Sequence, residues 1–212
     1  KLYYNLLYKN HNLIISSPKT KNINYNIDGN LKLKPFNFEA SLKIKNKKIN
    51  NIIDNLLVNL IFYDESYLGN LSGNLKIIFN DLDNKIINSG EIKFNIDEKK
   101  INLINSRFNL NKIGNMETKM RFSENQGDIK FISNNVLFIK DYIEFAKLFQ
   151  IATNKVKDIK KIYFDIERNI GDRDLTISNI KINNLNSVNN MNTKFVIKNI
   201  QNLRASFRQV ID

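Results

Sequence analysis

The chain has 212 residues, of which 42% are hydrophobic, and it carries a formal net charge of +12. It is long enough for one sizeable domain or two small ones, and its apolar content argues against wholesale disorder. The sequence contains no cysteine, which excludes disulfide frameworks, thiolate nucleophiles and cysteine-ligated zinc.

The lysine excess has two interpretations. A strongly basic protein can present a surface that binds polyanions. The alternative is AT-rich coding, since Asn, Lys and Ile crowd the chain, Pro occurs only twice and Trp is absent. We favour the second interpretation, because the basic residues are spread along the chain and Arg, whose guanidinium suits phosphate and base-edge contacts, is scarce. We therefore predict no nucleic-acid partner.

No stretch of the sequence is typical of a transmembrane helix. The most apolar stretch, from Ile52 to Tyr63, is interrupted by Asp54 and Asn59, and a bilayer span needs about 20 mainly apolar residues. The chain opens on Lys1 without a signal-peptide pattern, so we interpret it as a region of a longer protein. Any membrane anchor would then lie outside these residues.

The first predicted strands lie between residues 23 and 44. Apolar residues alternate with polar ones from Ile23 to Ile27, from Leu31 to Leu33 and again from Phe36 to Ile44. Between the first two runs stands Asp28-Gly29-Asn30. Glycine tolerates a positive φ, so this tripeptide predicts a hairpin turn.

Three stretches have helical spacing instead. Apolar residues at steps of three and four predict a helix near 48–62 and a weaker one near 200–210. A further helix is predicted near 141–151, where Asp141 and Glu144 resemble a capping box.

Period-2 alternation also predicts strands in the centre and toward the end of the chain. The alternating apolar residues include Leu75, Ile77 and Phe79, Ile92, Phe94 and Ile96, Met116, Met120 and Phe122, Ile129 and Phe131, Ile162, Phe164 and Ile166, and Leu175 and Ile177. Turns rich in Asp, Asn or Gly are predicted at 80–84, 97–100 and 125–127. The sequence therefore predicts a mostly β fold with two or three short helices, built as a meander of antiparallel strands, each with one polar and one apolar face. No linker is evident, so residues 1–212 are expected to form a single unit.

Catalytic and metal-binding patterns are weak. His11 is the only histidine, and no nucleophile elbow accompanies it, so we interpret it as a surface residue. Carboxylate pairs such as Asp81 and Asp83 lie in predicted turns, where Asp bends the backbone. No glycine loop has the ending that phosphate binding requires. We therefore predict a protein that is not an enzyme, with no catalytic residues, no metal site and no cofactor.

The strand rhythm and a few glycines resemble AsmA-like proteins, over about residues 28 to 183. The later part resembles the carboxy-terminal region of large AsmA-domain proteins. The runs that carry this resemblance are Gly73 to Ile77, Gly90 to Phe94, Phe108 to Asn115, Gly127 to Phe131, Tyr142 to Ile151 and Ile162 to Ile166.

This resemblance implies a curved antiparallel β-sheet, a β-groove, within a longer protein of the Gram-negative periplasm that is anchored in the inner membrane by a segment absent from this chain. The groove would hold phospholipid acyl chains, for lipid transport or outer-membrane maintenance. The candidate groove residues are Ile92, Phe94, Ile96, Phe122, Ile129, Phe131, Phe164 and Ile166.

Two alternatives stay open. The same apolar residues could form the core of a closed β-sandwich covered by the helices. The chain could also be a structural or adhesive β-module that binds other envelope proteins through its sheet edges.

Overall fold

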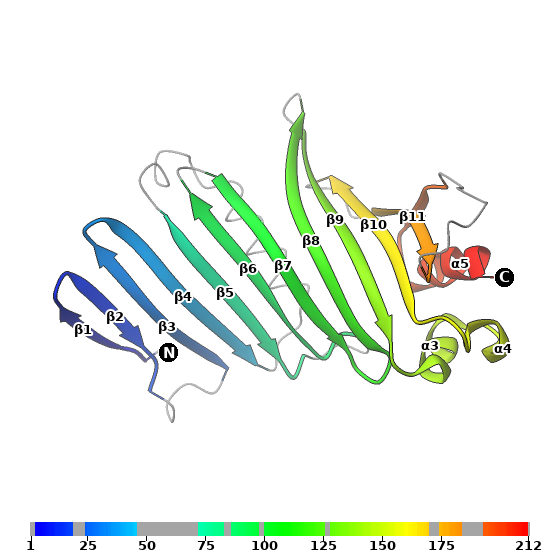
Figure 1. Ribbon diagram of the computed structural model, residues 1–212, viewed down its shortest axis with the longest axis horizontal. Coiled ribbons are helices and arrows are strands. Elements are labelled where there is room, and N and C mark those ends of the chain that lie inside the picture. The colour runs from blue at the N-terminus through cyan, green and yellow to red at the C-terminus, as the bar shows by residue number, and fades with distance from the viewer. Residues whose placement is uncertain are drawn as a thin grey trace. The chain divides into compact units, whose positions relative to one another are not determined.

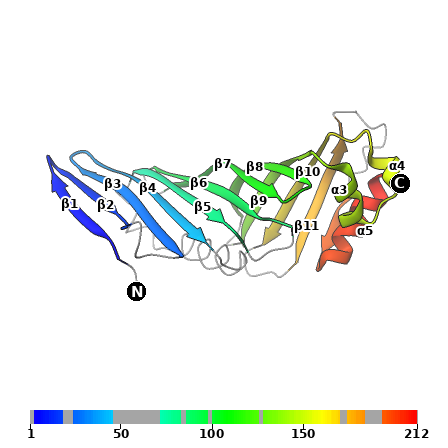
Figure 2. The same ribbon diagram turned by 90° about the horizontal axis from the view of Figure 1, so that it is seen from below.

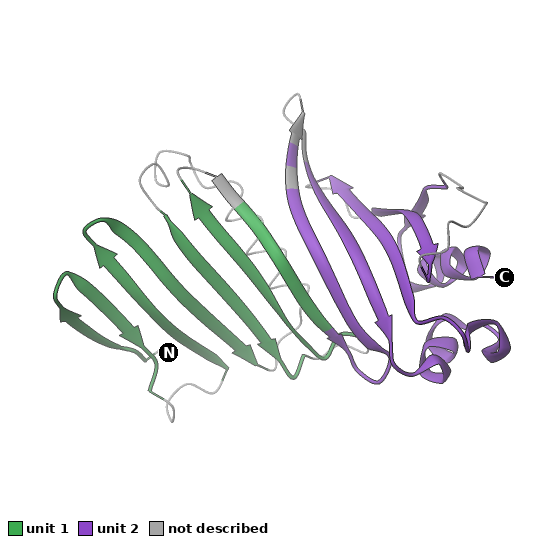
Figure 3. Ribbon diagram, in the orientation of Figure 1, with its two compact units in different colours: residues 1–108 green, residues 109–212 purple. Residues whose placement is uncertain are grey.

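The computed structural model describes residues 3–18, 24–45, 72–82, 86–97, 100–125, 128–169, 174–183 and 193–211. The chain divides into two compact units, unit 1 (residues 1–108) and unit 2 (residues 109–212), coloured separately in Figure 3. The division falls within a strand, so the expectation of one continuous domain stays a prediction.

Strands dominate both units, as Figure 1 shows. Unit 1 contains β1 (Asn5–Lys9), β2 (Asn12–Ser16), β3 (Tyr25–Leu33), β4 (Phe36–Lys45), β5 (Gly73–Asn80), β6 (Ser89–Asp97) and most of β7 (Lys100–Leu110). Unit 2 contains β8 (Gly114–Asn125), β9 (Asp128–Ile139), β10 (Lys161–Asn169), β11 (Leu175–Ile182) and β12 (Phe195–Ile197). Its helices are α3 (Tyr142–Phe149), α4 (Thr153–Val156) and α5 (Ile200–Ile211).

The strands form one 12-stranded sheet whose hydrogen-bonded order follows the chain, from β1 to β12. The predicted fold class, mostly β with short helices, is confirmed. The sheet is mixed, however, because β4 and β5 pair in parallel, where the sequence predicted antiparallel strands. Parallel neighbours need a crossover of a dozen or more residues, and the chain between Lys45 and Gly73 is long enough for one.

The turn predicted at Asp28-Gly29-Asn30 is wrong. These residues lie in the middle of β3, and Gly29 pairs with Ala40 of β4. The apolar alternation keeps its phase through Gly29, so the strand continues there and the hairpin closes at Lys34 and Pro35 instead. Alternation therefore outweighed the local turn preference.

A hairpin that the sequence analysis did not predict opens the chain. Strands β1 and β2 pair around a two-residue turn at Asn10 and His11, whose φ angles are 50° and 60°. Positive φ at both central residues is the geometry that suits the twist of a tight hairpin, and Asn adopts it more readily than most residues. His11 is thus an exposed turn residue.

The helices near 141–151 and 200–210 are confirmed as α3 and α5. Asp141 caps α3, since its carboxylate accepts hydrogen bonds from the backbone N–H groups of Ile143 (2.9 Å) and Glu144 (3.1 Å). The Glu144 side chain accepts a hydrogen bond from Lys147 at 2.8 Å. The helix predicted near 48–62 lies outside the described residues. Within the described part of the chain, no helix is long and apolar enough to cross a membrane.

An aromatic cluster joins α3 and α5 to the sheet in unit 2, where Figures 1 and 2 both show α3 beside α5. The Phe207 ring of α5 lies 4.5 Å from the ring of Phe149, 6.4 Å from that of Phe145 and 5.8 Å from that of Phe164 on β10. All four side chains are buried. Arg204 also donates from Nε to the carbonyl oxygen of Leu148 at 2.7 Å, which ties α5 to the end of α3.

Because Phe207 joins both helices to the sheet, Phe207→Ala should lower the free energy of unfolding by about 3–5 kcal/mol. Urea denaturation followed by circular dichroism measures this change. Gln201→Ala, at an exposed position of the same helix, should change it by less than about 0.5 kcal/mol. Equal effects of the two substitutions would mean that the cluster is not a central part of the core.

Candidate functional site

Three of the predicted groove residues lie together on β6. The side chains of Ile92, Phe94 and Ile96 share one face of the strand, opposite Ile77, Leu75 and Gly73 of β5. Their exposed fractions are only 5%, 2% and 4%. These three residues are therefore core residues in this arrangement, and their surfaces are closed to a ligand.

The other candidates belong to unit 2. Phe164 is buried against Phe207, while Ile166 and Phe131 are half-buried. Phe122 pairs with Phe131 in the register of β8 and β9, but its side chain, like that of Ile129, lies outside the described residues.

The face of unit 2 that contains Phe164 is also polar in part. Strand register places Thr118, Ser133 and Asn135 on it, and all three are buried. Asn135 is hydrogen-bonded, donating to Ser133 and to the carbonyl oxygen of Phe164, whereas the Thr118 hydroxyl has no hydrogen-bond partner within the described structure. This face is therefore less suited to acyl chains than the alternation in the sequence suggested.

A different apolar surface is accessible in unit 1. Cross-strand register places a set of large apolar side chains from the first four strands on one face of the sheet. We call this set the β1–β4 apolar face. Its members are Leu6, Tyr8, Leu13, Ile15, Tyr25, Ile27, Leu31, Leu33, Phe36, Phe38 and Leu42.

All of these side chains are exposed or half-buried. Exposure is highest on β1, at 57% for Leu6, and within β4 it falls from 40% at Phe36 to 2% at Ile44. On β5 and β6 the same face is buried, except for the half-buried Leu75. The accessible surface thus ends where the buried core of unit 1 begins.

Local sequence explains why β3 and β4 present this face. Leu31 pairs with Phe38 and Ile27 with Leu42, while Asp28, Asn30 and Lys32 point to the opposite side. The paired residues Gly29 and Ala40 interrupt the two rows of large side chains. The alternation in residues 23–44 was identified from the sequence, but these residues were not selected as a site, and β1 and β2 were not predicted. The signal for β1 and β2 was a pair of short continuous apolar runs, Leu6 to Tyr8 and Leu13 to Ile15, which lack the period-2 pattern.

The opposite face of the sheet is polar and carries charge. An open concavity of about 510 Å³ in unit 1 has a mostly apolar lining, which includes Ala40, Leu75 and Phe94 as well as Asp28, Glu39, Lys76 and Lys93, with Ile104 as an exposed apolar residue. Acidic and basic groups are mixed there, so no single charge would attract a ligand.

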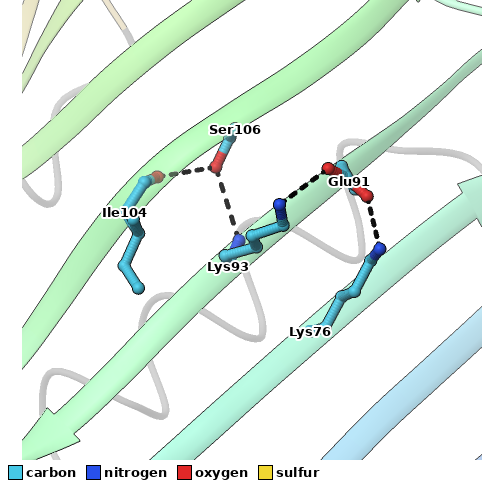
Figure 4. A network of polar contacts seen from close by, with 5 residues as sticks. All are labelled: Lys76, Glu91, Lys93, Ile104 and Ser106. Atoms are coloured by element: carbon cyan, nitrogen blue, oxygen red, sulfur yellow. Dashed lines mark hydrogen bonds and ion pairs between the residues drawn. The ribbon is translucent and has the colours of Figure 1, made fainter.

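Glu91 organises the basic residues on this polar face (Figure 4). Its carboxylate lies 2.7 Å from the Lys76 ammonium and 3.1 Å from that of Lys93. Those two lysines face each other across β5 and β6, so the carboxylate offsets their repulsion. The hydrogen bond from Lys76 is the main reason that the pKa of Glu91 falls below its usual value of 4.5.

Next to the ion pairs of Glu91, a side-chain hydroxyl takes part in the pairing of β6 with β7. The Ser106 hydroxyl accepts a hydrogen bond from the backbone N–H of Lys93 at 3.4 Å and donates to the Ile104 carbonyl oxygen at 3.1 Å (Figure 4). The buried positions of β7 also change from odd to even residue numbers between Leu103 and Ser106. This local irregularity leaves Ile104 exposed on the polar side.

Other chemistry is not apparent in the described ranges. His11 is exposed, and its Nδ1 lies 3.5 Å from the Tyr8 hydroxyl. Among the residues that the structure describes, no three His, Asp or Glu side chains gather in a way that could hold a metal ion. Comparison with protein-family models, with curated proteins and with solved structures finds no match to this chain.

The ion pairs of Glu91 contribute to the free energy of unfolding, and this contribution depends on pH. Because the folded-state pKa is lowered, this contribution is fully present above pH 4.5 and is lost as the pH falls through the folded-state value. The pairs are partly exposed, so we expect Glu91→Gln to cost at most about 1 kcal/mol at neutral pH.

Urea denaturation of both proteins between neutral and acidic pH measures this difference, which should shrink as the pH falls. Glu39→Gln, a matched change at an exposed carboxylate of the same face, serves as the control. If the difference in unfolding free energy between Glu91→Gln and the parent stays constant with pH, the ionised Glu91 carboxylate does not stabilise the fold as described.

Proposed function

We propose that this chain is a non-enzymatic lipid-handling segment of a bacterial envelope protein, and that the β1–β4 apolar face is its acyl-chain surface. The observation that carries the proposal is the accessibility of this face. It presents eleven large apolar side chains that are exposed or half-buried. A monomeric soluble protein rarely leaves a contiguous apolar patch of several hundred Å² uncovered.

The energetics of acyl-chain binding suit a surface without specific polar contacts. Each methylene removed from water contributes about 0.8 kcal/mol, and burial of apolar surface is not directional. A chain lying along several strands therefore binds without a defined pocket. On β3 the apolar row runs the length of the nine-residue strand, with Gly29 as its only small member, whereas on β4 it ends before the buried Ile44. The β3 row offers a path of roughly 30 Å.

We therefore place the proposed lipid site on β1 to β4, whereas the candidate residues chosen from the sequence lie on later strands. The proposal keeps the AsmA-like assignment, the periplasmic location and an anchor in the inner membrane outside this chain. The partners would be phospholipid acyl chains, and other envelope proteins could bind elsewhere. The role would be lipid transport between the two membranes or maintenance of the outer membrane.

The test uses the absence of tryptophan from the chain. A single tryptophan at Leu31 would report on the β1–β4 apolar face, and one at the neighbouring Lys32 would report on the opposite face. Each variant is mixed with vesicles of phosphatidylethanolamine and phosphatidylglycerol whose acyl chains carry bromine, which quenches tryptophan on contact.

We expect bromine to quench the fluorescence of Leu31→Trp strongly and that of Lys32→Trp little, because strand neighbours point to opposite faces. Vesicles without bromine give the reference intensity for each variant. Equal quenching of the two variants, or quenching of neither, would count against an acyl-chain surface on this face.

A further inference from the structure

Two turns of unit 1 lie next to each other at one end of the sheet. The turn between β1 and β2 and the turn between β3 and β4 stand at the same end in Figure 1. The backbone N–H of Leu33 donates to the carbonyl oxygen of His11 at 2.8 Å, which joins the two turns. We call residues 9–12 together with residues 32–37 the hairpin tip.

The hairpin tip is basic. It contains Lys9, Lys32 and Lys34 but no Asp or Glu. All three lysines are exposed. Among the residues that the structure describes, none of the three forms an ion pair with a carboxylate. Their charges therefore face solvent without compensation.

Three other lysines of unit 1 have acidic partners. Lys43 lies 3.9 Å from Asp28, and Lys76 and Lys93 lie 2.7 and 3.1 Å from Glu91. Coding bias accounts for the number of lysines in the chain, but the fold gathers the lysines of the hairpin tip without a carboxylate beside them. A local positive charge of this kind suits an anionic partner.

The hairpin tip also has an apolar side. Strand register places Tyr8, Leu33 and Phe36 on the β1–β4 apolar face, whereas Lys9 and Lys32 lie on the opposite face. The exposed fractions of the three apolar side chains are 61%, 38% and 40%. Exposed aromatic and aliphatic residues beside lysines are typical of protein surfaces at a bilayer interface, where rings lie at the headgroup level and ammonium groups reach the phosphates.

The spacing of the lysines indicates the form of the anionic partner. Lys9 and Lys32 lie in one register row, with Asn12 of β2 between them. Neighbouring strands lie about 4.8 Å apart, so the backbones of these two lysines are separated by about 10 Å. Lys34 lies beyond them, in the turn. Exposed ammonium groups spread over this width suit an extended anionic surface better than a single small anion.

From these observations we propose that the hairpin tip docks on the surface of an anionic phospholipid bilayer. Its three lysines lie against the headgroup phosphates, and Tyr8 and Phe36 enter the boundary between headgroups and acyl chains. Each lysine near an anionic bilayer strengthens binding about fivefold.

Docking by the hairpin tip goes beyond acyl-chain binding. It requires charged headgroups and the tip, whereas the proposed acyl-chain site uses the whole β1–β4 apolar face. Where both hold, the docked tip brings the end of the apolar row on β3 to the bilayer surface, at the point where an acyl chain would leave the bilayer.

Vesicle flotation tests the dependence on headgroup charge. One set of vesicles contains phosphatidylglycerol and phosphatidylethanolamine, and the other contains phosphatidylcholine alone. We expect the parent chain to bind the anionic vesicles, with an affinity that falls as the salt concentration rises. Its affinity for the neutral vesicles should be about 100-fold lower.

Two matched triple variants separate the hairpin tip from net charge. Lys9→Gln, Lys32→Gln and Lys34→Gln, made together, should weaken binding to the anionic vesicles by about 100-fold. The control combines Lys112→Gln, Lys119→Gln and Lys140→Gln, at exposed positions of unit 2. It removes the same formal charge and should change the affinity by less than about threefold.

Tryptophan fluorescence tests the apolar side in a chain without tryptophan. Phe36→Trp places the fluorophore on the β1–β4 apolar face, and Asn37→Trp places it on the opposite face of the same strand end. We expect the anionic vesicles to shift the emission of Phe36→Trp to shorter wavelength and to leave that of Asn37→Trp nearly unchanged, because neighbouring residues of a strand point to opposite faces.

Circular dichroism checks that each variant keeps its strands. Equal losses of affinity in the two triple variants overturn the proposal, since binding would then follow net charge. Equal binding to anionic and neutral vesicles, or an unchanged emission of Phe36→Trp, also overturns it. Binding to double-stranded DNA as tight as binding to the anionic vesicles overturns a lipid surface as the partner.

The same measurements separate this docking from acyl-chain binding. If the triple variant of the hairpin tip binds vesicles as the parent does while brominated lipid still quenches Leu31→Trp, the docking tip is overturned and the acyl-chain surface is retained. If binding depends on the tip lysines but brominated lipid leaves Leu31→Trp unquenched, the docking tip is supported and the acyl-chain surface is not.

Discussion

Antiparallel strand register is the constraint on which the rest of the structure depends. Each strand places alternate side chains on opposite faces, and pairing aligns those faces between neighbours. A shift of one residue between β3 and β4 would move Leu31 and Ile27 to the polar side. The match of Leu31 with Phe38 and of Ile27 with Leu42 therefore determines whether an apolar surface exists at all.

Burial then divides that surface into two parts with different roles. On β5 and β6 the apolar side chains of this face are buried, except for the half-buried Leu75, and they stabilise unit 1 as a core. On β1 to β4 the side chains of the same face keep contact with solvent, except for the buried Ile44. Exposed apolar area of this extent lowers solubility and invites association, so its presence is best explained by a partner that covers it. The proposed lipid acyl chain would lie on this face and cover it.

Sequence patterns predicted the elements that local chemistry controls. The Asp141 cap and the alternation from Ile92 to Ile96 appear in the structure as predicted. Part of each turn predicted at 80–84, 97–100 and 125–127 lies outside the described residues. Gly29 misled the prediction because a glycine signals a turn only when the apolar phase also breaks there. The hairpin at Asn10 and His11 was missed because its strands are short and its turn has no glycine.

The site could not be predicted in the same way. Ile92 and Ile27 follow identical alternation patterns, but one is buried and the other is half-buried. Burial depends on what the folded chain packs against each strand, and that information is distributed over distant segments. Alternation alone therefore identifies an apolar face without showing where that face is open.

The accessibility of the β1–β4 apolar face is the central claim, and cysteine labelling measures it directly in a chain that has no other thiol. Single cysteines at Ile27 and Ile92 are exposed to a polar maleimide, with and without phospholipid vesicles. The account predicts that the Ile27→Cys variant reacts readily, that lipid protects it, and that the Ile92→Cys variant reacts slowly in both conditions. Rapid labelling at Ile92 together with slow labelling at Ile27, or labelling at Ile27 that lipid leaves unchanged, would contradict it.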